Sequence, residues 1–143
     1  MFIKIAKTFL VSATLLAALS AGSHAAEDLE AGKTAFGTYC ASCHGVSAMG
    51  NGPVAGQLVS KPSDLTVLAR NANGVFPHEA VRAVIDGRTM ITAHGGREMP
   101  VWGDMFVFEV TGGGVAEDDS ELTAEFVDQR IEQLTAYIGS IQQ

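Results

Sequence analysis

The chain has 143 residues, of which 47% are hydrophobic and 17% charged, and its net charge is -7. This length fits one small domain and is too short for a two-domain dinucleotide enzyme. The low charged fraction and the high apolar content argue against an intrinsically disordered chain. The acidic balance argues against binding to nucleic acid, because a phosphate backbone requires a basic protein face.

Residues 1–25 have the three parts of a secretory signal peptide. Two lysines precede an apolar run over residues 9–19, and small residues follow up to Ala25. This run is well short of the ~20 apolar residues that a membrane-spanning helix needs. We therefore expect cleavage after Ala25, which leaves residues 26–143 as an exported, soluble, periplasmic domain with no membrane span. Cleavage removes two of the nine basic residues and no acidic one, so the net charge becomes -9.

The two cysteines belong to a Cys40-Ala41-Ser42-Cys43-His44 run. In an exported protein two cysteines would ordinarily suggest a disulfide, but that pairing leaves His44 without a role. A redox-active dithiol needs a preceding strand, and a zinc site normally needs a second pair of ligands. The C-x-x-C-H spacing instead predicts covalent haem attachment through both thiols, with His44 as an iron ligand.

The segments around this motif, taken in order, make the chain similar to the small class I cytochromes c, which carry one haem. These segments are residues 30–39, 50–53, 62–66 and 97–103, and a C-terminal helix that ends near residues 136–138. The resemblance implies an all-α fold in which the N- and C-terminal helices cross, while loops and short helices enclose one covalent haem c. It also implies that Pro53 supplies the backbone carbonyl to which His44 donates its second ring N–H.

Apolar periodicity and capping residues predict four helices, over residues 28–39, 64–70, 77–86 and 123–141. The last has a one-face apolar stripe and Thr123 as a possible cap; the stripe consists of Val127, Ile131, Leu134, Ile138 and Ile141. In the first helix, Gly32 costs about 1 kcal/mol relative to alanine, so a packing reason is expected. The resemblance implies that the last helix crosses closely there. Residues 112–114 are three glycines and predict a flexible connection.

Met99 is the best candidate for the sixth iron ligand. Pro100 follows it and favours an extended backbone at Met99, which suits a ligand loop better than a helix. The resemblance points to the same position. Met90 and Met105 are the other methionines that lie far enough from the haem motif, and His94 is a rival that would give bis-histidine ligation.

The two haem propionates need basic or indole donors, because buried negative charge is costly without partners. Arg97 and Trp102 flank Met99 and are the first candidates, ahead of Arg88 and Arg70.

Ligation by both His44 and Met99 leaves no vacant iron position, so we expect a one-electron carrier and not an enzyme. Two alternatives stay open: a haem enzyme or gas-binding protein with a displaceable sixth ligand, and a dedicated cytochrome subunit of an exported dehydrogenase. The acidic surface predicts redox partner proteins with basic docking surfaces, and the oligomeric state stays open.

Overall fold

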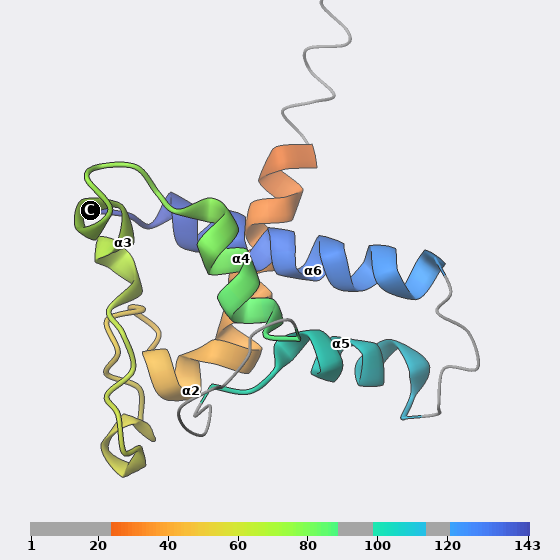
Figure 1. Cartoon of the computed structure of the whole chain (residues 1–143), viewed down its shortest axis with the longest axis horizontal. Coiled ribbons are helices and arrows are strands. Elements are labelled where there is room, and N and C mark those ends of the chain that lie inside the picture. The colour runs from red at the N-terminus through yellow and green to blue at the C-terminus, as the bar shows by residue number, and fades with distance from the viewer. Residues whose placement is uncertain (1–23, 89–98, 114–120) are drawn as a thin grey trace, which may run out of the picture.

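The computed structural model describes residues 24–88, 99–113 and 121–143, and every regular element in these ranges is a helix (Figure 1). The expected all-α fold is thereby confirmed. In the described part of the chain, no helix is both long enough and apolar enough to cross a bilayer. The predicted signal peptide lies, apart from its last two residues, outside the described residues and stays a prediction.

The first helix covers residues 24–35 and continues without a break into the haem motif. A π-helical turn, η1 (Phe36–Cys40), follows it and leads directly into α2 (Ala41–His44). The remaining elements are η2 (Ala55–Gln57), η3 (Leu65–Val67), α3 (Leu68–Asn71), α4 (His78–Asp86), α5 (Trp102–Thr111) and α6 (Glu121–Ser140).

α6 is the central helix, because the first helix, α4 and α5 all pack against it (Figure 1). Four of the five residues of the predicted stripe are buried, and Ile141 is half-buried just beyond the helix end; the four are Val127, Ile131, Leu134 and Ile138. The helix begins before Thr123, so the expectation that Thr123 caps it is wrong.

The predicted close crossing of the first helix and α6 is present at Gly32. A Cβ atom added to Gly32 would lie 2.0 Å from the carbonyl oxygen of Gln133, so only glycine fits there. The Phe36 and Tyr137 rings pack beside the crossing, with centroids 5.4 Å apart. The Gln133 amide also donates to the Asp28 carboxylate at 3.0 Å. These contacts join the segment that carries the haem motif to the core of the protein.

Both short predicted helices are confirmed. The Asp64 carboxylate accepts a 2.9 Å hydrogen bond from the Thr66 amide and so caps η3, which continues into α3. α4 follows Pro77 and ends at Gly87, whose φ of 72° gives the left-handed conformation of a C-terminal cap.

The C-terminal residues hold α3 and η3 against the end of α6. The Gln142 amide donates to the carbonyls of Leu65, at 2.7 Å, and Ile138, at 2.8 Å. Its oxygen accepts from the Ala69 amide at 2.8 Å. One side chain therefore joins three segments; we call this set of hydrogen bonds the Gln142 brace.

α4 and α6 are also joined by charged side chains. Both ring nitrogens of His78 face carboxylates, with Nδ1 at 3.2 Å from Glu79 and Nε2 at 2.9 Å from Glu132. Arg82, one turn further along α4, pairs with Glu132 and Asp128. An imidazole can donate from both nitrogens only when it is protonated.

Stability should therefore depend on the charge of His78. Partial burial alone would lower the His78 pKa, but the Glu79 and Glu132 carboxylates outweigh it and raise the pKa above its usual range. The stabilisation is fully present below the pKa of about 6.5 that histidine has in an unfolded chain, and it is lost as pH rises through the raised folded value. We expect His78→Gln to cost about 0.5 kcal/mol at pH 5.5, a value reduced for solvent screening, and close to nothing at pH 9. Urea unfolding of both proteins at the two pH values measures this; an equal cost at both would contradict it.

Candidate functional site

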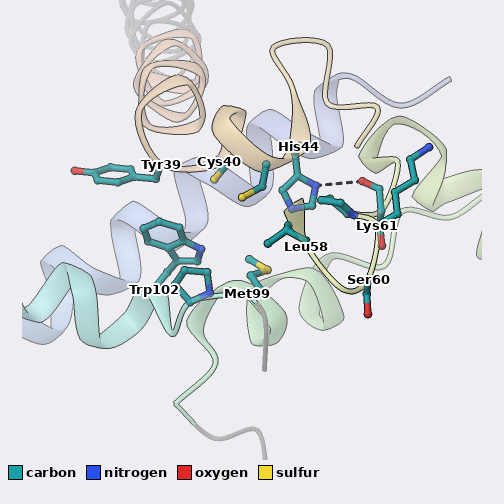
Figure 2. Close-up of a pocket in the computed structure, with 12 residues that line it drawn as sticks. Tyr39, Cys40, His44, Leu58, Ser60, Lys61, Met99 and Trp102 are labelled. Atoms are coloured by element: carbon teal, nitrogen blue, oxygen red, sulfur yellow. Dashed lines mark hydrogen bonds between the residues drawn. The ribbon is translucent and has the colours of Figure 1, made fainter. Parts of the chain in front are cut away.

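A pocket of about 710 Å³, counting the solvent at its open side, lies beside the haem motif (Figure 2). α2 and η1 form one wall of the pocket, and residues 58–63 form a second. The third wall consists of Met99, Pro100 and Trp102, the first residue of α5. The lining thus includes five of the residues expected from the sequence: Cys40, Cys43, His44, Met99 and Trp102.

The loop after the motif folds back onto the C-terminal end of α2. The amides of Gly50 and Gly52 donate to the carbonyls of His44, at 2.8 Å, and Cys43, at 3.1 Å. A Cβ on Gly52 would lie 2.3 Å from the Ser42 carbonyl, so the close approach requires glycine. Carbonyls at a helix end need such partners, and here they keep the helix end rigid next to the iron-ligand candidate.

The His44 ring is oriented by a backbone carbonyl, as expected, but not by the one expected. Its Nδ1 lies 3.1 Å from the carbonyl oxygen of Ser63 (Figure 2). Pro53 is exposed and does not line the pocket, so the expectation that its carbonyl holds His44 is wrong. The turn that contains Pro53 is folded onto α2, whereas the segment after Pro62 passes beside the ring. Donation from Nδ1 leaves Nε2 with the lone pair that an iron ligand needs.

The two cysteines are free thiols, Cys40 buried and Cys43 half-buried. Burial, with a smaller effect of the neighbouring Cys43, raises the pKa of Cys40 to about 12. Redox-active dithiols depend on a thiolate with a lowered pKa, so this environment argues against a dithiol oxidoreductase. Both sulfurs instead line one pocket with His44, which is the arrangement that covalent haem attachment needs.

Met99 and His44 approach the pocket from opposite sides (Figure 2). Met105, one of the other methionines considered, lies on α5 with 49% of its surface exposed and does not line the pocket. Met90 and the rival ligand His94 lie outside the described residues. Of the methionines in the described part of the chain, Met99 alone lines this pocket.

Of the four candidate donors for the haem propionates, one lines the pocket. Trp102 lines the pocket, and Arg97 lies outside the described residues. Arg88 binds the Asp86 carboxylate at 2.6 Å, and Arg70 is exposed and does not line the pocket. Lys61 does line the pocket and was missed from the sequence. It directly precedes residues 62–66, a segment similar to class I cytochromes, and this is a signal that could have indicated it.

Comparison with known families decides the family. A family model described as cytochrome c oxidase, cbb3-type, subunit III matches residues 27–111, which is more than half of the chain. The chain belongs to this family of c-type cytochromes. No curated protein and no solved structure matched the chain. The match to this cytochrome family includes the haem motif, Met99 and all of α5, and it ends before α6.

The side chains of this cytochrome fit a haem c. The pocket offers two thiols for the vinyl groups, a histidine with one ring nitrogen already engaged, and a thioether facing it. Leu58, Pro62 and Pro100 add apolar surface to the lining. Within the described ranges no group of three or more His, Cys, Asp or Glu side chains is placed to hold a bare metal ion. These residues would hold a haem c, with Cys40 and Cys43 bound to its vinyl groups and with His44 and Met99 at its iron.

Proposed function

We propose that this cytochrome is an exported, periplasmic one-electron carrier with a single haem c attached through Cys40 and Cys43. In this proposal His44 and Met99 would hold the haem iron. The observation that carries the proposal is the placement of these two side chains on opposite sides of the pocket that both thiols line.

The chain's own residues determine what the site can do. A bound haem supplies a one-electron Fe(II)/Fe(III) couple, and thioether ligation favours the ferrous state. The Ser63 carbonyl fixes the His44 ring. Met99 lies on the opposite side of the pocket, so His44 and Met99 together would hold the iron and leave it no position for a substrate. Apolar side chains around the pocket limit the entry of water, which reduces solvent rearrangement when the charge changes. These features favour electron transfer over catalysis.

The charge of the chain supports partners with basic docking surfaces. The sequence has sixteen acidic residues against nine basic ones, and two of the basic ones fall in the predicted signal peptide. Basic partners would be steered to such a surface, and association would slow as salt is added.

A second candidate is a permanent subunit of a redox complex. The description of the matching family names a subunit of an oxidase, and this is the observation that favours it. Size-exclusion chromatography of the native exported fraction distinguishes the two, because a free carrier elutes at its own mass and a subunit elutes with its complex.

Spectroelectrochemistry of the purified holoprotein tests the carrier. We expect a reversible one-electron couple, and no carbon monoxide adduct of the ferrous protein after several minutes at pH 7. Haem should stay with the polypeptide after acid–acetone extraction, at one haem per chain. Rapid stoichiometric carbon monoxide binding would instead support a gas-binding protein or a haem enzyme.

A further inference from the structure

An aromatic cluster forms one end of the pocket. The Tyr39 ring centroid lies 5.5 Å from that of Trp102 and 5.4 Å from that of Phe106. Trp102 in turn stacks on Phe106, with centroids 6.0 Å apart. Phe106 is fully buried, so the cluster is anchored in the core. Tyr39 and Trp102 both line the pocket, where Figure 2 shows them next to each other.

The cluster connects the two walls that carry the proposed haem contacts. Tyr39 directly precedes Cys40 in η1, and Trp102 begins α5 only three residues after Met99. Pro100 has a fixed φ, so little slack separates Met99 from Trp102. A displacement of Trp102 relative to Tyr39 would therefore move Met99 relative to the haem motif.

A hydrogen bond outside the aromatic cluster fixes the Tyr39 side chain. Its hydroxyl donates a 2.8 Å hydrogen bond to the Glu109 carboxylate on the last turn of α5. Burial and this hydrogen bond raise the pKa of Tyr39, so the hydroxyl stays protonated and continues to donate. Arg130 of α6 lies over the Phe106 ring, 6.0 Å from its centroid, and supports the same cluster. One tyrosine thus contacts both the first and the last turn of α5.

We propose that Tyr39, held by Glu109, is a positioning residue that keeps Met99 opposite His44. This role rests on the proposed axial ligation by Met99. The ring of Tyr39 sets the position of Trp102, while its hydrogen bond to Glu109 fixes the orientation of α5 relative to η1. Weakening either contact increases the fraction of molecules in which Met99 is off the iron.

Four variants of the holoprotein test this role through the rate at which the ferrous form binds carbon monoxide, since carbon monoxide must replace Met99. Tyr39→Leu removes the ring contacts and should raise this rate about tenfold. Tyr39→Phe and Glu109→Ala remove the hydrogen bond alone and should raise it about threefold. Glu109→Gln keeps an acceptor oxygen and should stay within about twofold of the parent. The sulfur-to-iron band at the red end of the ferric spectrum should weaken in the same order.

Gln142→Ala is the control, because it removes the Gln142 brace, whose partners Leu65, Ala69 and Ile138 lie on η3, α3 and α6 and not on α5. It should lower the urea midpoint and leave the carbon monoxide rate unchanged. A normal band in the parent together with an unchanged rate in Tyr39→Leu would overturn the proposal for Tyr39 alone. Equal effects of Gln142→Ala and Tyr39→Leu on the rate would also overturn it, because general destabilisation would then explain both. Absence of the band in the parent would overturn the Met99 ligation together with this role.

Discussion

Gly32→Ala is expected to lower the free energy of unfolding of the holoprotein by about 3 kcal/mol. The added methyl group would lie 2.0 Å from a backbone oxygen and 3.0 Å from the Cβ of Tyr137. A backbone oxygen cannot rotate away, so the first helix must move relative to α6. That movement would also disturb the Phe36–Tyr137 contact. Urea unfolding of the holoprotein, followed by far-UV circular dichroism, measures the loss.

Gly37→Ala is the matched control for this substitution. Gly37 lies five residues further along the same continuous helix, and a Cβ there meets nothing within 4 Å. Alanine is favoured over glycine in helices, so this variant should be neutral or more stable by up to about 1 kcal/mol. Equal unfolding midpoints for Gly32→Ala and Gly37→Ala would show that the crossing is less close than the structure indicates.

Met99 lies on the side of the pocket opposite His44. Of the substitutions on that side, Met99→Ala is expected to have the largest effect on the spectrum, the reduction potential and the carbon monoxide affinity of the haem. The sulfur-to-iron band should disappear, because alanine cannot ligate iron. The reduction potential should fall by on the order of 100 mV, because thioether ligation raises it. The apparent affinity for carbon monoxide should rise by on the order of 100-fold, since a tethered ligand competes at a high effective concentration. Potentiometry and a carbon monoxide titration measure these changes.

Met105→Ala separates ligand loss from the general effect of removing a methionine from this region. Met105 is half-exposed on α5 and does not line the pocket. Its spectrum, potential and carbon monoxide affinity should equal those of the parent. If Met99→Ala keeps the parent spectrum, Met99 is not the ligand, and His94→Ala becomes the variant to examine.

Sequence periodicity predicted the helices that have one apolar face and clear ends. α6 has a stripe of buried aliphatic residues, and α4 ends at the left-handed Gly87, so both signals were readable. α5 was missed because its apolar residues surround the helix: Phe106 is buried, whereas Met105 and Phe108 are exposed. No side-chain cap marks its start either. Contacts with α6, and not local pattern, explain why this segment is helical.

The residues of the candidate site were predictable where they belong to a short motif with a fixed spacing. The C-x-x-C-H run gave three lining residues, and the Met99-Pro100 pair gave a fourth. The partner of His44 was not predictable, because any residue offers the same backbone carbonyl and only the path of the chain selects Ser63. The contacts of Tyr39 were not predictable for a related reason. They join Tyr39 to Trp102 and Glu109, more than sixty residues away, whereas the sequence pattern indicated only that Tyr39 belongs to a helix.

The π-helical turn has a consequence for comparing this chain with others. In η1 the Ala41 amide reaches back five residues to the Phe36 carbonyl, instead of the four of an α-helix. The helix therefore contains one additional residue between Gly32, which packs against α6, and Cys40, which belongs to the haem motif. A relative whose first helix is α-helical throughout would superimpose on both faces only with a one-residue gap inside the helix. Alignments that forbid gaps in helices would misplace either the crossing glycine or the haem motif by about 100° of rotation.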